Sequence, residues 1–156
     1  MRGRRALKYL LCALALMTAR SLAAEQEIGF DVDVSLSARA AAELAARHEK
    51  INVWAAWYGM ATEAAAKHAD EMGQIDFGSE TVLVSGAGGR AHLTGQHVTI
   101  EHLDWVQDRT VTVLVNVYSA RLSSQDNLLD CGLFEDSVAA SRAKPIEIAC
   151  KLIGEQ

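Results

Sequence analysis

Histidine is the residue type in this sequence best suited to metal chemistry, and three of the five histidines, His92, His97 and His102, fall at intervals of five. Imidazole nitrogens bind Zn²⁺ and Cu²⁺ well. Successive side chains of a β-strand point to opposite faces, so intervals of five cannot place all three histidines on one face of a regular strand. A bend at Gly95 would bring His92 and His97 together, with His102 at the next turn. The three are therefore candidates for a Zn²⁺ or Cu²⁺ site, and the alternative is that each histidine is solvated separately.

Three aromatic residues, Trp54, Trp57 and Tyr58, crowd one short segment with the pattern of a β-strand. Alternation puts Trp57 on one face and Trp54 with Tyr58 on the other. In a two-layer sandwich only one face of a strand belongs to the core, so one of these two sets faces outward. Exposed Trp and Tyr are enriched at binding surfaces. The three residues are therefore candidates for a binding face, and a covering loop, such as residues 60–72, is the alternative.

Patterns associated with catalysis are either missing or out of context. The sequence contains no GxSxG and no HExxH motif, and the glycines of residues 86–89 are not followed by the Lys-Ser/Thr of a phosphate loop. Ser141 and Lys144 fit the S-x-x-K pattern, but that motif needs a helix beginning at the serine, and Pro145 follows at once. We interpret the acidic segment around His68 as a solvated loop. We expect no enzyme activity and no bound cofactor.

The first 24 residues have the composition of a secretory signal peptide. Four basic residues within the first eight precede an apolar run, residues 9–17, and then the small-x-small site that ends at Ala23. Nine apolar residues are too few to cross a bilayer, which needs about 20. We predict a signal peptide over residues 1–24, cleaved near Ala23 or Ala24, and one domain over residues 25–156 that is periplasmic or secreted.

Two cysteines, Cys131 and Cys150, lie beyond this leader. An even number of cysteines in an exported chain usually pairs. Closing the loop between them would stabilise the fold by about 3 kcal/mol on the chain-entropy view. We predict a disulfide, with two buried thiols as the alternative.

The charge of the expected mature chain limits its partners. The whole sequence has a formal charge of −5, with 15 basic and 20 acidic residues. Residues 1–24 contain five of the basic residues and none of the acidic ones, which leaves a formal −10 on residues 25–156. A field of this sign repels nucleic acids and anionic membrane surfaces and attracts a basic partner. The sequence leaves the oligomeric state open.

The segment that must organise the fold is residues 110–120, where positions 111, 113, 115 and 117 are all valine. Period-two spacing of β-branched residues predicts a central strand. Further strands are expected at 28–36, 51–58, 74–77, 81–85, 90–94 and 146–152, with Gly59 ending the second. Short helices are expected at 38–48 after a Ser37 cap, within 60–72, at 100–106 and at 134–141, and Leu133 is expected in the core.

About seven strands with short helices in the connections indicate a mainly β fold, an antiparallel β-sandwich of immunoglobulin- or transthyretin-like architecture. Such a fold carries no function by itself. The first function hypothesis is a small exported acidic binding protein, an inhibitor- or immunity-type partner of a basic protein. The second is a periplasmic metal- or small-ligand-binding protein that uses His92, His97 and His102.

Overall fold

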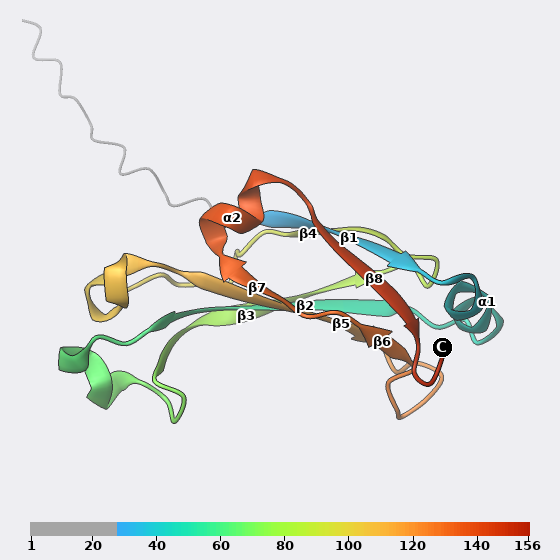
Figure 1. Ribbon diagram of the computed structural model, residues 1–156, viewed down its shortest axis with the longest axis horizontal. Helices are drawn as coiled ribbons and strands as arrows, with labels where there is room; N and C mark the ends of the chain where they lie inside the picture. Colours follow the sequence, from blue (N-terminus) through green and yellow to red (C-terminus); the bar gives the residue numbers. More distant parts are fainter. Residues whose placement is uncertain (1–27) are drawn as a thin grey trace, which may run out of the picture.

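The computed structural model describes residues 28–156, so the expected signal peptide lies outside the described residues. Within this range the chain forms two four-stranded β-sheets packed face to face (Figure 1). Sheet A has the order β4 (Gly89–Leu93), β1 (Phe30–Leu36), β8 (Ile146–Leu152) and β6 (Leu129–Cys131). Sheet B has the order β3 (Gln74–Val84), β2 (Ile51–Met60), β5 (Thr112–Ser119) and β7 (Phe134–Ser137). The predicted β-sandwich is confirmed, with β1 and β8 as a parallel pair among antiparallel neighbours.

The valine strand lies in the interior of sheet B, between β2 and β7, as predicted. Val113 and Val115 are fully buried, and Val111 and Val117 are nearly so. They face the alternating apolar residues of sheet A, which come mainly from β1 and β8: Phe30, Val32, Val34, Ile146 and Ile148. Burial of these two inner faces provides most of the hydrophobic stabilisation of the fold.

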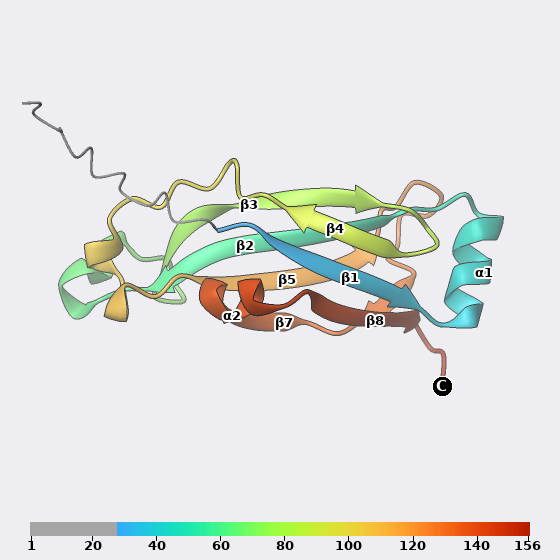
Figure 2. The same cartoon turned by 90° about the horizontal axis from the view of Figure 1, so that it is seen from above.

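Short helices close the two ends of the sandwich (Figure 2). Helix α1 (Ala38–Ala46) begins after Ser37, whose Oγ accepts a hydrogen bond from the Ala40 N–H at 3.0 Å, and it buries Leu44. The opposite end is formed by 3₁₀ turns, namely η1 (Glu63–His68), η2 (Leu103–Trp105) and η3 (Gln107–Arg109). Helix α2 (Val138–Ala143) connects β7 to β8.

The connection from β3 to β4 differs from the sequence prediction. Residues 74–84 form one strand instead of two, because a bulge at Gly78, with φ of +113°, absorbs the break in the pattern. The turn at residues 85–88 leads into β4, but β4 pairs with β1 in the other sheet. This turn is therefore a crossing from sheet B to sheet A and not a β-hairpin.

Three further expectations are corrected. Strand β2 continues through Gly59 to Met60, and Gly59 lies directly against the side chain of Val106. Residues 134–137 form β7 instead of the first half of a helix, because they pair with residues 112–115 of β5. Leu133 is 70% exposed, since it lies in the bend before β7 and not in the core.

Candidate binding surface

The aromatic cluster of β2 is divided between the two faces of sheet B. Trp57 is fully buried, its indole N–H donates to the Ile28 carbonyl at 3.3 Å, and its ring lies 5.6 Å from that of Phe30, centroid to centroid. Trp54 lies on the opposite face and is half-buried. Of the two arrangements that the alternation allows, the structure therefore has Trp57 inside and Trp54 with Tyr58 outside.

Tyr58 nevertheless contributes little exposed surface. Its side chain is only 8% exposed, and its hydroxyl donates a hydrogen bond to the Glu135 carboxylate on β7. Burial, together with the hydrogen bond and charge of Glu135, raises the pKa of Tyr58 to about 12. The phenol thus stays protonated near neutral pH and ties β2 to β7. Tyr118 of β5, half-buried, is the second accessible aromatic residue of this face.

We call this surface the outer face of sheet B. Its centre is made by the outward residues of β2 and β5, where Trp54 is paired with Asn116 and Ala56 with Leu114. On β3, Thr81 lies beside Trp54, and Leu83 lies beside Asn52. The outward residues of the four strands include Asp76, Ser79, Thr81 and Leu83, then Asn52, Trp54, Ala56 and Tyr58, then Thr112, Leu114, Asn116 and Tyr118, and finally Glu135 and Ser137. The two carboxylates among them, Asp76 and Glu135, both lie next to Tyr58, and none of these residues is Lys or Arg.

Loops project past this face at both ends of the sheet (Figure 1). The connection from β2 to β3, residues 61–73, lies at one end, and the loop 120–128 lies at the other. No helix or strand of residues 28–156 covers the middle of the face between them. At the second end the Arg121 guanidinium carbon lies 5.8 Å from the centre of the Tyr118 ring, a cation–π contact. The face already holds a cation on one of its aromatic rings.

A buried carboxylate fixes the loop that carries Arg121. Glu49 is 3% exposed and accepts hydrogen bonds from the N–H groups of Lys50, Leu122 and Ser123 at 2.8 to 3.0 Å and from the Ser123 hydroxyl at 2.6 Å. Burial favours the neutral form, but the hydrogen bonds outweigh it and lower the pKa of Glu49 to about 2. The carboxylate therefore stays ionised and holds this end of the outer face of sheet B in place. Sequence reasoning missed it.

The other end of the face is acidic. Glu135 and Asp76 flank Tyr58, on β7 and β3 respectively. The connection 61–73 adds Glu63, Asp70 and Glu71 and a single basic residue of the Lys/Arg type, Lys67. Asp70 also shapes the connection, because its Oδ1 accepts from the N–H groups of Met72 and Gln74 at 2.8 Å. These carboxylates therefore give this end of the outer face of sheet B a negative potential.

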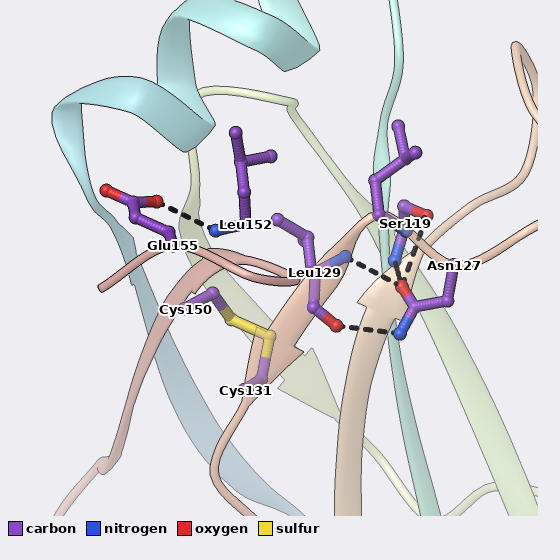
Figure 3. Close-up of a disulfide and its surroundings, with 8 residues drawn as sticks. Ser119, Asn127, Leu129, Cys131, Cys150, Leu152 and Glu155 are labelled. Atoms are coloured by element: carbon purple, nitrogen blue, oxygen red, sulfur yellow. Dashed lines mark hydrogen bonds between the residues drawn. A yellow bond between two sulfur atoms is a disulfide. The ribbon is translucent and has the colours of Figure 1, made fainter.

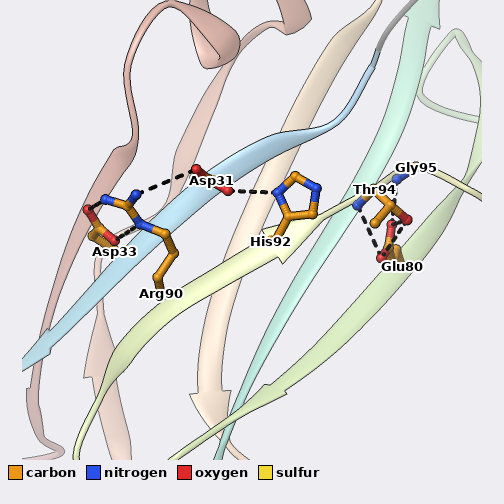
Figure 4. A network of polar contacts seen from close by, with 7 residues as sticks. All are labelled: Asp31, Asp33, Glu80, Arg90, His92, Thr94 and Gly95. Atoms are coloured by element: carbon orange, nitrogen blue, oxygen red, sulfur yellow. Dashed lines mark hydrogen bonds and ion pairs between the residues drawn. The ribbon is translucent and has the colours of Figure 1, made fainter.

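The outer face of sheet A has the opposite character (Figure 4). Arg90 of β4 donates two hydrogen bonds of 2.7 Å to Asp33 of β1, and Asp31 lies 2.7 Å from Nδ1 of His92. The hydrogen bonds from Arg90 lower the pKa of Asp33, and Asp33 raises that of Arg90. Glu147, Lys151 and Asp130 continue this charged surface on β8 and β6. A polar outward face is typical of a sheet that is simply solvated.

The three candidate metal-binding histidines have different neighbours and are not brought together. His92 pairs with Asp31 on sheet A, the Nε2 atom of His97 lies 2.9 Å from the Gln96 amide nitrogen, and His102 stacks on Trp105. Within residues 28–156 no three His, Cys, Asp or Glu side chains are grouped as a metal site requires. Nothing in this geometry favours the metal-binding hypothesis over separately solvated histidines.

The stack at Trp105 is a second feature that sequence reasoning missed. The rings of His68 and His102 cover the two faces of this indole, with centroid distances of 3.9 and 4.0 Å and interplanar angles below 10°. It joins η1 to η2, which are 35 residues or more apart in the sequence. No local pattern signals such a contact. It stabilises the end of the sandwich from which the acidic connection projects.

The predicted disulfide between Cys131 and Cys150 is present, and it joins directly opposed residues of β6 and β8 (Figure 3). Beside it, Asn127 fixes the entry to β6. Its Oδ1 accepts from the N–H groups of Ser119 and Leu129, and its amide donates to the Leu129 carbonyl at 2.7 Å. The loop 120–128 is thus fixed by the disulfide beyond one end and by the hydrogen bonds to Glu49 near the other.

Comparison with known proteins finds no matching family model, no significantly similar curated protein and no significantly similar solved structure. In the described range, 28–156, no helix is both long and apolar enough to span a membrane. The functional argument therefore rests on the surfaces of this chain alone.

Proposed function

We propose that this protein is a small exported binding protein that holds a basic protein partner against the outer face of sheet B. The observation that carries the proposal is the contrast between the two outer faces of one sandwich. Sheet A presents paired charges, whereas sheet B presents Trp54, Leu114 and Tyr118 among neutral Asn and Thr side chains. Half-exposed aromatic residues in an uncharged, uncovered centre are the composition expected of an interface core.

The charge of the domain supports a basic partner. Residues 28–156 contain 18 acidic and 10 basic side chains, a formal −8. Five of the carboxylates lie at the Tyr58 end of the face, where Lys67 is the one opposing Lys or Arg of the connection 61–73. Electrostatic complementarity of this kind accelerates association and selects partners by sign.

The aromatic residues suggest how such a partner binds. Arg121 lies over the ring of Tyr118 within the same chain. An Arg or Lys side chain of the partner can occupy the equivalent position over Trp54, since Trp is the strongest cation–π acceptor among the aromatic side chains. The amides of Asn52 and Asn116, which flank Trp54, can then hydrogen-bond to the partner backbone. This mode fits an inhibitor- or immunity-type protein, which acts by occupying a surface of its target.

Two observations support export. The disulfide fits an oxidising compartment. The first 24 residues of the sequence have the basic, apolar and small-residue regions of a signal peptide. Both agree with a periplasmic or secreted binding protein.

The experiment is site-specific photocrosslinking followed by calorimetry. A photoreactive amino acid replaces Asn116 on sheet B or, as the matched control, Glu147 on sheet A. We expect a basic envelope or secreted protein to crosslink at position 116 and not at 147. Binding of that purified protein should then weaken at least tenfold for Trp54→Ser, as for a central hot-spot residue, and remain unchanged for Glu147→Gln.

Circular dichroism and thermal unfolding verify that each variant is folded. Equal crosslinking at both positions, or an acidic partner whose affinity does not depend on Trp54, would overturn the proposal.

A further inference from the structure

Strand β3 has one side that pairs with no strand of the described chain. The Ala120 N–H donates a hydrogen bond to the Lys50 carbonyl, so the backbone groups of residue 50 point toward β5. Because this direction alternates along a strand, the even-numbered residues of β2 form backbone hydrogen bonds with β5, and the odd-numbered residues form them with β3. From the β2–β3 register, residues 78, 80, 82 and 84 bond to β2. The backbone groups of Ser79, Thr81 and Leu83 therefore point to the free edge.

This free edge is accessible. Ser79, Thr81 and Leu83 are exposed, with Leu83 at 51%, and their backbone groups have no hydrogen bond to a loop among residues 28–156. The segment that contains Thr99 covers the edge of β3 only as far as Phe77, where the Thr99 N–H donates a hydrogen bond to the Phe77 carbonyl at 3.0 Å. In Figure 2, β3 runs along one margin of the molecule. Six unpaired backbone groups in a row form a template for another strand.

The carboxylate next to this edge, that of Glu80, already has hydrogen-bond partners within the chain. An inward-pointing charged residue on an edge strand normally opposes pairing, because pairing would bury it. Glu80 is such a residue, but its carboxylate accepts hydrogen bonds from the Thr94 N–H and hydroxyl and from the Gly95 N–H, at 2.6 to 3.3 Å (Figure 4). A strand added at β3 would not leave this carboxylate without partners.

We propose that β3 pairs antiparallel with β3 of a second copy of this chain and forms a symmetric dimer. In one register all three residues whose backbone groups point to the free edge are paired. Thr81 lies opposite Thr81 of the second copy on the two-fold axis, and Ser79 lies opposite Leu83 on either side of it. This register gives six intermolecular hydrogen bonds and makes the two B sheets continuous. It also places Glu80 opposite Val82, so that the two Glu80 carboxylates do not face each other.

A second copy is the favoured occupant because the edge complements itself. An isologous interface needs one patch that matches its own rotated image, and the Ser79–Thr81–Leu83 arrangement meets this condition. The sequence Thr81-Val82-Leu83-Val84 is uncharged and rich in β-branched residues, which favours strand pairing. The contact is small, so the dimer should be weak and reversible.

Sedimentation velocity of the purified protein across the micromolar to millimolar range tests the proposal. We expect a concentration-dependent dimer. Thr81→Lys and Thr81→Glu should each weaken it about tenfold, because like charges meet on the axis, and an equimolar mixture of the two variants should restore it. Thr81→Ala, which keeps the backbone N–H and adds no charge, is the matched control and should dimerise like the wild type. Position 81 is exposed, so these variants should fold normally.

A wild-type protein that stays monomeric over this range would overturn the proposal. Dimers that are insensitive to both charged variants, or a mixture that fails to restore association, would do the same. Loss of the dimer in Trp54→Ser with no effect at Thr81 would place self-association on the outer face of sheet B instead. The monomeric and charge-insensitive outcomes leave the proposed binding of a basic partner unaffected, because the calorimetry measures that binding separately.

Discussion

Glu49 is the single side chain whose ionisation contributes most clearly to the fold. Its pKa of about 2 in the folded protein is below the ordinary value of 4.5. A depressed carboxyl pKa stabilises the folded state above pH 4.5, and this contribution is lost as the pH falls from 4.5 to 2. We expect Glu49→Gln to lower the free energy of unfolding by about 1–3 kcal/mol at pH 7, with the deficit disappearing near pH 2. Urea unfolding at a series of pH values measures both effects.

The matched control for Glu49 is Glu147→Gln. It removes the same formal charge from an exposed position of β8. Its stability should therefore follow that of the wild type at all pH values. A Glu49→Gln variant as stable as this control at pH 7 would contradict the role of the buried carboxylate.

Residues whose role depends on near neighbours in the sequence were predictable, and those with distant partners were not. Ser37 was recognised as a helix cap because it precedes an alanine-rich segment, and it accepts from Ala40 three residues later. Glu49 bonds to Leu122 and Ser123, which are 73 and 74 residues away. No local pattern distinguishes such a carboxylate from a solvated one.

At the scale of elements, strands with a continuous pattern were predictable. The valines of β5 share one face, and the pattern places β5 in the interior of a sheet, where it lies. Strand β3 was divided because Gly78 interrupts its alternation, whereas the ladder continues through a bulge. Strand β7 has the sequence FEDS, with little β-propensity, and exists because it pairs with β5.

Packing of β2 against the segment that precedes β5 can be tested at Gly59. A Cβ atom added at this position would lie 2.5 and 2.6 Å from the two methyl groups of Val106, a buried and stiff side chain. We expect Gly59→Ala to lower the free energy of unfolding by about 1–3 kcal/mol, as overpacking does. Gly132→Ala is the matched control, since nothing lies within 4 Å of its added Cβ. Equal denaturation midpoints for the two variants would contradict the close packing.

The disulfide connects the short strand β6 to β8. With three residues, β6 makes few ladder contacts of its own, so the covalent link restricts how far it can separate. We expect Cys131→Ala with Cys150→Ala to fold but to lose about 3 kcal/mol of stability, through the entropy of the loop between the cysteines. Reductant should lower the melting temperature of the wild type and leave the double variant unchanged. A wild type that melts alike with and without reductant would count against this contribution.

For the whole molecule, the sequence predicted the sign of the net charge but not its distribution. Composition and the expected cleavage gave a strongly acidic domain, yet the placement of paired charges on sheet A and neutral aromatic residues on sheet B follows from strand register. Register depends on which strands meet, and β1 with β4 and β2 with β5 are each more than 45 residues apart. The alternation of Trp54 and Trp57 indicated that one set faces outward, while the fold decided which.

The net charge then predicts opposite salt dependences for the two proposed associations. A formal −8 on residues 28–156 attracts a basic partner and repels a second copy. Raising ionic strength from about 0.01 to 0.15 M shortens the Debye length from about 30 to 8 Å and screens both interactions. We expect calorimetric affinity for the basic partner to fall, mainly through slower association, and the dimer fraction in sedimentation to rise over the same range. If both associations weakened with salt, self-association would have to involve oppositely charged surfaces, which the edge of β3 does not provide. If neither changed, the acidic end of the outer face of sheet B would have no part in recognising the partner.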